Sequence, residues 1–193
     1  MADMIIKLQD FSGPDFARHV DALAALRIEV FRDWPYLYDG DPAYEADYLR
    51  AYTGSSDAVI VAVRDGARLI GAATGAPMED HAEEFGAPLE RAGFDLSDVF
   101  YCGESVLLPA YRGQGVGHAF FERREAAARR LGRRYACFCA VIRPDTHPAR
   151  PAAYRPLDPF WRKRGYVPRD DITASFAWRD VGDTAETEKP MRV

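Results

Sequence analysis

Three glycines alternate in the segment YRGQGVG, which spans residues 111–117. Gly113, Gly115 and Gly117 follow Arg112 and precede a run of residues with helical spacing. Glycine lets a backbone approach a ligand closely, and the first turn of a helix favours an anion. The pattern therefore predicts a loop whose backbone amides hold a phosphate or pyrophosphate, with Arg112 as a nearby cation. A tight strand-to-helix turn in which the glycines serve only packing is the alternative interpretation.

The spacing of these glycines argues against the two common nucleotide loops. The P-loop requires G-x-x-x-x-G-K-[ST], and no Gly-Lys pair follows here. The dinucleotide fingerprint G-x-G-x-x-G would end on His118 or Phe120 instead of glycine. The next apolar run, RYACFCAVI, also lacks the acidic residue expected ~20 residues downstream to bind a ribose.

Glu104 is the only acidic residue in the strand-like run 99–108. Strand alternation would place it on one face with Phe100, Cys102 and Val106. A carboxylate in such a strand can take a proton from a bound substrate, which is the role of a general base. Glu104 is the predicted base. A glutamate that is ion-paired with an arginine and serves structure alone is the alternative.

Helical and strand-like patterns alternate along the chain and predict the elements that position these residues. The periodicity predicts helices over 15–31, 44–52, 116–131 and 158–164, and a partly helical segment over 78–94. It predicts strands over 4–10, 99–109, 134–142 and 172–178, a hairpin within 57–77 that turns at Asp65-Gly66, and an edge strand within 184–193. This order predicts one mixed α/β domain over residues 1–193, with helices on both faces of a single central sheet.

Composition narrows the classes of partner. The formal net charge of −5 argues against a nucleic-acid partner. No apolar run approaches the ~20 residues of a membrane span, and the N-terminus does not resemble a signal peptide. Cys102, Cys137 and Cys139 are an odd number in strand-like surroundings, which predicts free thiols in the cytoplasm and no metal site.

The stretch SVLLPAYRGQGVG resembles the acyl-CoA loop of the GNAT superfamily of N-acetyltransferases, in which an apolar strand and proline precede [QR]-x-x-G-x-[GA]. The likeness is strongest from Gly103 to Leu131 and extends more loosely to LRIEVF and DPFWRKRGY. It implies a GNAT-type mixed, mostly antiparallel central sheet of six to seven strands flanked by about four helices. It also implies acetyl-CoA as cosubstrate, direct transfer of its acetyl group to a primary amine, and a homodimer, since dimers are common in the family.

The resemblance carries over to particular residues. It implies that a glutamate on this strand, Glu104, is the general base. The strand backbone would pair with the pantetheine arm at Val106, Leu107 and Leu108, and an N–H near Val106 or Leu107 would polarise the thioester carbonyl. The loop amides would hold the pyrophosphate at Arg112, Gly113, Gln114, Gly115, Val116 and Gly117. His118 lies in the first turn of the helix, and we expect it on the helix surface rather than at the phosphate.

The resemblance also implies where the acceptor binds. The segment between the first two helices borders the acceptor pocket in the family, which points to Trp34, Tyr36 and Tyr38, with ordinary aromatic packing as the alternative. A polyamine, an amino acid, an antibiotic, a peptide N-terminus and a lysine side chain all remain open as acceptors. The basic, proline-rich loop 143–156 would close the opposite wall.

Two departures from the family pattern concern the proton donor to the leaving thiolate. Trp161 stands where many members have a tyrosine, and an indole N–H has no usable acidity. Tyr154 and Tyr166 are nearby alternatives, and water is a third. The usual asparagine after the next strand is also missing, because VIRPDTHP stands there. A non-catalytic acyl-CoA-binding or sensing module is therefore the second hypothesis.

Overall fold

The computed structural model describes residues 6–81 and 85–193, and the strands within these ranges form two sheets. The five-stranded sheet has the order β1-β2-β3-β4-β5, and the three-stranded sheet has the order β6-β8-β7. The strands are Ile6–Ser12 (β1), Val59–Asp65 (β2), Arg68–Pro77 (β3), Val99–Leu107 (β4), Tyr135–Cys137 (β5), Ala140–Val141 (β6), Thr173–Trp178 (β7) and Thr187–Arg192 (β8). All neighbouring strands are antiparallel except β4 and β5.

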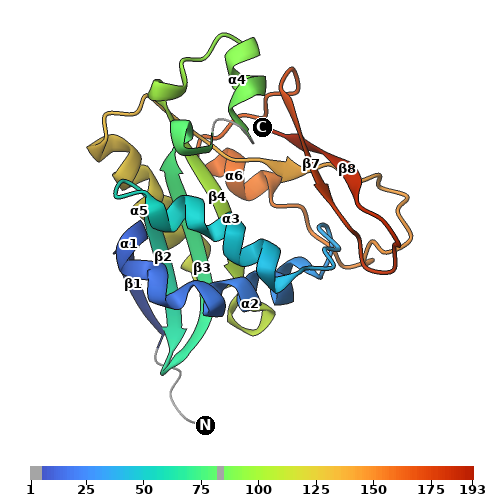
Figure 1. The fold of residues 1–193 in the computed structure, drawn as a ribbon. Coiled ribbons are helices and arrows are strands. Elements are labelled where there is room, and N and C mark those ends of the chain that lie inside the picture. Colours follow the sequence, from blue (N-terminus) through green and yellow to red (C-terminus); the bar gives the residue numbers. More distant parts are fainter. Residues whose placement is uncertain (1–5, 82–84) are drawn as a thin grey trace.

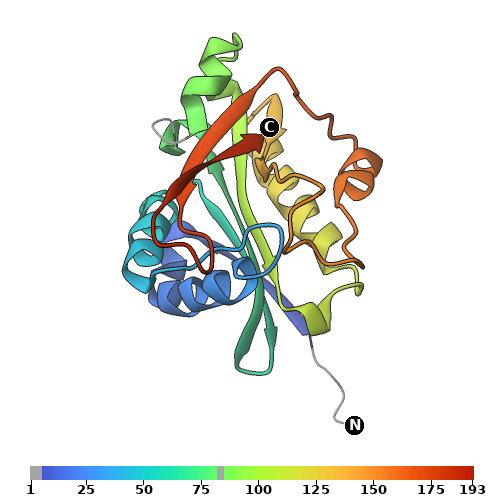
Figure 2. The same cartoon turned by 90° about the vertical axis from the view of Figure 1, so that its right-hand side faces the viewer.

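Helices cover both faces of the larger sheet (Figure 1). The α-helices are Gly13–Phe16 (α1), Val20–Phe31 (α2), Pro42–Gly54 (α3), Ala87–Arg91 (α4), Val116–Arg130 (α5) and Asp158–Lys163 (α6). Figure 2 shows α1, α2 and α3 on one side of the strands and α5 on the other. Helix α6 lies beside α5, where the rings of Phe121 and Phe160 are 5.6 Å apart. The predicted α/β class with helices on both faces is confirmed.

Local sequence signals explain where the helices begin. Ser12 caps α1 by accepting a hydrogen bond from the Asp15 amide at 3.4 Å, and Asp41 caps α3 by accepting one from the Tyr44 amide at 2.9 Å. A proline follows each cap in the first turn, where its missing N–H costs nothing. The partly helical segment predicted over 78–94 contains a 3₁₀ turn at Met78–His81 and α4, while its residues 82–84, like residues 4 and 5 of the first predicted strand, lie outside the described ranges.

The larger sheet opens at one end between β4 and β5. The predicted hairpin joins β2 and β3 around Gly66, whose φ is +57°. Strand β4 pairs with β3 along most of its length, but it pairs with β5 only from Val99 to Tyr101. Beyond Tyr101 the two strands part, so among the described residues no strand lies beside this edge of β4.

Two strand predictions are wrong. Residues 134–142 were expected to form one strand, but the chain breaks at Phe138 and Cys139 and gives β5 and β6 in different sheets. The C-terminal segment was expected at an edge, but β8 lies between β6 and β7 and is the central strand of its sheet. The single predicted sheet is therefore divided in two at the point where β5 leaves β4.

The described residues were also compared with what a membrane span and a metal site require. Helices in this part of the chain are too short or too polar to cross a bilayer. Across 6–81 and 85–193, no group of three or more His, Cys, Asp or Glu side chains is arranged to hold a metal ion.

Candidate active site

Glu104 lies in an irregular part of β4. The register between β3 and β4 shifts between residues 73 and 75, where Gly103 and Glu104 together lie opposite Thr74. Two residues opposite one define a β-bulge, which bends the strand and redirects its side chains. The Glu104 amide donates a hydrogen bond to Thr74 Oγ1 at 3.4 Å.

The bulge separates residues that strict alternation would place on one face. Phe100 lies on the same face of the sheet as Arg124 of α5, because a Cβ on Gly75 would lie 2.5 Å from Phe100 and 3.3 Å from Arg124. Glu104 instead meets Arg27 of α2, on the other face of the sheet. The predicted common face is therefore wrong, because the extra residue of a bulge reverses the alternation beyond it.

Arg27 binds Glu104 and a second buried carboxylate, Glu45 of α3. Its Nη1 lies 2.5 Å from Glu104 Oε2, and its Nε donates to Glu45 Oε2. Glu45 is fully buried and Glu104 is 4% exposed. The guanidinium also lies 4.3 Å from the ring centre of Tyr48, a cation–π contact. The arginine pair that we considered for Glu104 is thus present, with one cation shared between two carboxylates.

Glu104 keeps one oxygen that the cluster does not use. Within the described residues its Oε1 has no hydrogen-bond partner. The neighbouring phenols Tyr48 and Tyr52, with their oxygens 3.3 Å apart, are poor bases at neutral pH. Burial raises the pKa of both hydroxyls, and the charge of Glu104 raises it further. A carboxylate is the usual kind of side chain for such a base, so Glu104 is better suited than either phenol to accept a proton.

Arg124 of α5 holds the bulge from the opposite face. It is 1% exposed, and its Nη1 donates to the carbonyls of Thr74 and Glu104 at 3.3 and 3.0 Å. Its Nη2 donates to Ser105 Oγ at 2.8 Å. These bonds satisfy backbone carbonyls that a bulge leaves outside the ladder. Arg124 therefore fixes the backbone that carries Glu104.

The free edge of β4 presents the backbone of Leu107. The Leu108 amide donates to the Ile70 carbonyl at 2.9 Å, so it points toward β3. Because strand residues alternate in direction, the polar groups of Leu107 and Ser105 point to the opposite edge, where β5 has left the sheet. Arg112 Nε donates to the Leu107 carbonyl there at 3.2 Å. Of the three strand residues predicted to pair with the pantetheine arm, only Leu107 directs its backbone N–H and C=O toward the opening. The backbone groups of Val106 and Leu108 point toward β3. Sequence reasoning missed Ser105, whose backbone groups also point toward the opening.

The glycine loop turns sharply into α5. Gly113 and Gly115 have φ values of +80° and +82°, a region that favours glycine. A Cβ on either one would meet no atom within 4 Å, so packing does not explain them. In the described residues the amides of residues 113–115 donate to no protein acceptor, and the first helical amides, Val116 and Gly117, have no partner within α5. Consecutive amides at a helix N-terminus form an anion-binding turn.

The three aromatic residues predicted at the acceptor side separate into two groups. Trp34 packs against the proline-rich loop, 5.1 Å from the ring of His147 and 5.9 Å from that of Tyr154. The Tyr36 ring lies 4.5 Å from that of Phe31, which in turn lies against Arg27. Burial raises the pKa of both the Tyr36 and the Tyr38 hydroxyl, and Glu45 raises that of Tyr38 further.

The candidate proton donors have different surroundings. Trp161 packs 4.9 Å from the ring of Phe138 and lines a cavity of about 280 Å³ between α6 and β5. That cavity includes no residue of the bulge or of the glycine loop. The Tyr166 hydroxyl donates to Glu125 at 3.2 Å, so it is already engaged. Tyr154 makes no such bond in the described residues. His118 lies on the helix surface as expected, with Nδ1 3.2 Å from Arg164.

The three cysteines are free thiols. Burial raises the pKa of Cys102 and Cys137, and it raises the pKa of Cys139 to about 12. A thiol acts as a nucleophile only when ionised. The geometry therefore supports packing rather than an acyl-carrier role for these residues.

Sequence reasoning missed the two buried arginines. Arg27 falls on the apolar face of its helix, between Leu23 and Val30, and a charge on such a face signals a buried partner. Arg124 gave no comparable signal, because it lies within the charged run ERRE.

Comparisons with known proteins concern the family and the fold. The model of the Acetyltransferase (GNAT) family matches residues 23–166, a range that contains Arg27, the bulge and the glycine loop. A comparison with curated proteins gave no match.

Solved structures share the fold over most of the chain. A proposed acetyltransferase from Acinetobacter baylyi has a TM-score of 0.62 at 12% identity and covers 100% of this chain and 93% of that one. A proposed acetyltransferase from Salmonella typhimurium, solved with its cofactor acetyl-CoA, has a TM-score of 0.54 at 14% identity, with coverages of 100% and 94%. An aminoglycoside N-acetyltransferase solved with CoA has a TM-score of 0.50 at 15% identity, with coverages of 75% and 79%.

Proposed function

Because this chain belongs to the acetyltransferase (GNAT) family, we propose that it transfers the acetyl group of acetyl-CoA directly to a primary amine. The observation that carries this proposal is the position of Glu104. The carboxylate lies in the β4 bulge with an unused oxygen, next to the edge where β4 and β5 part. A base at that point is within reach of an amine that attacks an acetyl group held along the free edge.

The donor is proposed to bind along β4 and the glycine loop. The polar groups of Leu107 and Ser105 would pair with the amide groups of the pantetheine arm, as an added strand does. The amides of residues 113–117, with Arg112 beside them, would hold the pyrophosphate. Both features belong to one continuous stretch of chain, so one extended ligand fits them together.

The reaction needs one base and one oxyanion donor. Glu104 takes a proton from the acceptor ammonium, directly or through a water, and leaves a neutral amine. The amine nitrogen bonds to the acetyl carbon, the bond from that carbon to sulfur breaks, and CoA leaves as the thiolate. The Leu107 N–H would stabilise the oxyanion in between, which leaves the Leu107 carbonyl and the Ser105 groups for the pantetheine arm. The nitrogen loses its extra proton as the amide forms, and that proton passes through Tyr154 or water to the thiolate, so the products are the amide and the CoA thiol.

The surroundings of Glu104 favour a cationic acceptor. One arginine faces two carboxylates in this cluster, so a second cation would balance the charge. Tyr36 and Tyr38 supply aromatic faces nearby, which attract an ammonium group. We therefore propose a small-molecule or peptide amine as the acceptor, without a nucleic-acid or membrane partner.

Three further parts of the sequence prediction remain proposals. We propose a single domain over residues 1–193, a cytoplasmic location in keeping with free thiols, and a homodimer, which rests on the family resemblance alone.

A non-catalytic acyl-CoA-binding module is the second candidate. It is favoured by Trp161 at the position of the family's tyrosine and by the engagement of Tyr166 with Glu125. An equilibrium titration with acetyl-CoA, followed by CoA release over a broad panel of amines, separates the two. Binding with turnover supports the acetyltransferase, and binding without turnover supports the module. Absence of binding at millimolar acetyl-CoA contradicts both.

Replacing Gly115 with alanine is expected to weaken acetyl-CoA binding roughly tenfold, which is about 1.4 kcal/mol. The added Cβ strains a left-handed residue and projects beside the amide cluster. Isothermal titration calorimetry with acetyl-CoA measures the change.

Gly132→Ala is the matched control at the other end of α5. Gly132 has a φ of +70° and, like Gly115, no atom within 4 Å of an added Cβ. Both variants should lose about 1–2 kcal/mol of stability, but only Gly115→Ala should bind acetyl-CoA more weakly. Equal affinities in the two variants would count against a pyrophosphate at this loop.

A further inference from the structure

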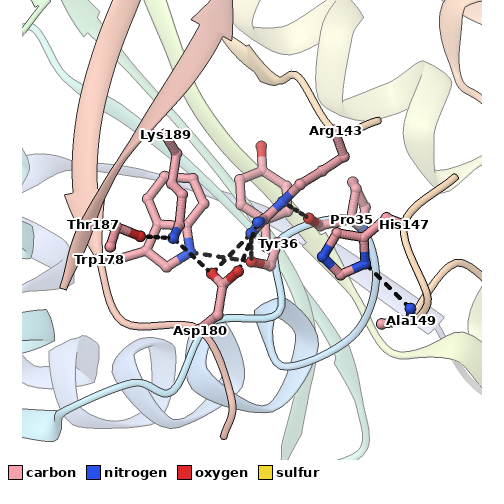
Figure 3. A network of polar contacts seen from close by, with 9 residues as sticks. All are labelled: Pro35, Tyr36, Arg143, His147, Ala149, Trp178, Asp180, Thr187 and Lys189. Carbon is pink, nitrogen blue, oxygen red and sulfur yellow. Dashed lines mark hydrogen bonds and ion pairs between the residues drawn. The ribbon is translucent and has the colours of Figure 1, made fainter. Parts of the chain in front are cut away.

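Arg143 joins two segments that lie far apart in the sequence (Figure 3). Its Nη1 and Nη2 donate to the two oxygens of Asp180 at 2.6 and 2.8 Å, a bidentate pair. Its Nε donates to the Pro35 carbonyl at 3.0 Å, and its Nη2 also donates to the Tyr36 carbonyl at 2.7 Å. The Arg143 side chain is 9% exposed. One guanidinium thus fastens the segment between α2 and α3 to the residues that follow β7.

Other bonds join the same two segments. Trp178 Nε1 donates to the Tyr36 carbonyl at 3.1 Å, and the Val181 amide donates to the Leu37 carbonyl at 2.7 Å. Leu37 is the only described residue other than glycine with a positive φ, at +55°. A conformation of this kind persists only where surrounding contacts enforce it. The segment is therefore held in one shape by the contacts from the C-terminal strands.

Asp180 stays ionised in this setting. Burial opposes the charge, but the hydrogen bonds and charge of Arg143, together with Lys189 at 3.3 Å, hold the pKa of the carboxyl below its ordinary value. The Arg143–Asp180 pair is therefore intact at neutral pH.

The backbone of Tyr36 is fixed, whereas its hydroxyl is not. The Tyr36 carbonyl accepts two hydrogen bonds, while the Tyr36 phenol points away from the network (Figure 3). The ring packs 4.5 Å from that of Phe31, which also lies against Arg27. The Tyr36 hydroxyl makes no hydrogen bond within the described residues. A chain of contacts therefore leads from the Tyr36 ring through Phe31 to Arg27, the cation that binds Glu104.

We propose that Arg143 and Asp180 are positioning residues for the acceptor and act through Tyr36, whose free hydroxyl bonds the acceptor beside Glu104. The inference rests on the proposed function. It assigns to the Arg143–Asp180 pair an effect on acceptor binding, although neither side chain reaches the acceptor itself.

Steady-state kinetics of Tyr36→Phe, Arg143→Lys and the double variant test this. Each single variant is expected to raise the acceptor KM roughly three- to tenfold, the effect of one lost hydrogen bond. The KM for acetyl-CoA should stay within about twofold. Because both changes act on one contact, the double variant should be no worse than the worse single variant.

Arg179→Lys is the matched control. Arg179 pairs with Asp39 at 2.8 Å between the same two segments, but at the exposed surface and without contact to Tyr36. Its acceptor KM should be unchanged. An unchanged acceptor KM in Tyr36→Phe, or multiplied effects in the double variant, would overturn the positioning role. Tyr36→Phe leaves the Arg143 contacts intact, so this test holds even if Arg143→Lys folds poorly.

The outcomes also separate this inference from the function on which it rests. If the wild-type protein releases no CoA with any amine, the acetyltransferase proposal and the positioning role both fall. If the wild type turns over and the variants keep its acceptor KM, only the positioning role falls.

Discussion

Replacing Glu104 with glutamine is expected to lower kcat for amine acetylation by about 10²–10⁴-fold, the usual contribution of a general base. Glutamine keeps the size of the side chain but cannot take up a proton from an ammonium. Acetyl-CoA binding should be nearly unchanged, because the proposed donor contacts lie in the backbone of β4 and the glycine loop. Steady-state kinetics with calorimetric titration of acetyl-CoA measures both quantities.

The deficit of Glu104→Gln should depend on pH. A free alkyl amine needs no base, and its share of the acceptor rises as the pH approaches a pKa near ~10. The variant should therefore be most impaired at low pH and should approach the wild type as the pH rises. A deficit that is constant with pH would indicate damage to the site rather than loss of a base.

Glu45→Gln is the control for the structural interpretation of Glu104. Both carboxylates bind Arg27, and both are buried, but only Glu104 lies at the open edge of β4. If Glu104 serves only to pair with Arg27, the two variants should lose similar activity. We expect Glu104→Gln to lose far more, and equal losses would assign Glu104 a structural role.

Replacing Arg27 with methionine is expected to destabilise the protein by about 3–5 kcal/mol, because removing one member of a buried ion pair leaves its partner uncompensated. Here two buried carboxylates, Glu45 and Glu104, would lose their shared cation. Urea unfolding of the wild type and the variant measures the change in the free energy of unfolding.

Two further variants test whether the destabilisation comes from the stranded carboxylates rather than from replacing an arginine as such. Arg50→Met removes an exposed arginine that pairs with Asp47 on α3, and it should cost no more than about 0.5 kcal/mol. Adding Glu45→Gln to Arg27→Met removes one of the two stranded charges and should recover part of the loss. A cost for Arg27→Met as small as that for Arg50→Met would contradict a charged cluster in the core.

The sequence predicted the features that depend on local chemistry. Apolar spacing placed α3 and α5 within about two residues of their observed bounds, whereas the one helix predicted over 15–31 is divided into α1, a 3₁₀ turn at Ala17–His19 and α2. The alternating glycines predicted the turn into α5. In the structure, Gly113 and Gly115 have a left-handed backbone conformation, and close packing does not require them. Glu104 stood out as the one acidic residue in an apolar strand.

The features that were not predicted depend on contacts between distant segments. A bulge needs a partner strand to define it, so the side of the sheet that Glu104 faces could not be read from alternation. The break at Phe138 and Cys139 follows from how β8 joins β6, more than fifty residues further along the chain. The arginines that hold Glu104, Arg27 on one face and Arg124 on the other, have partners that only the fold brings near.

The most direct test of the central claim is the stoichiometry of one reaction. The protein is incubated with acetyl-CoA and an amine that supports CoA release, and both CoA and acetylated amine are quantified, the latter by mass spectrometry. Direct transfer predicts equal amounts of the two products, with both falling together in Glu104→Gln. CoA release without acetylated amine would contradict it.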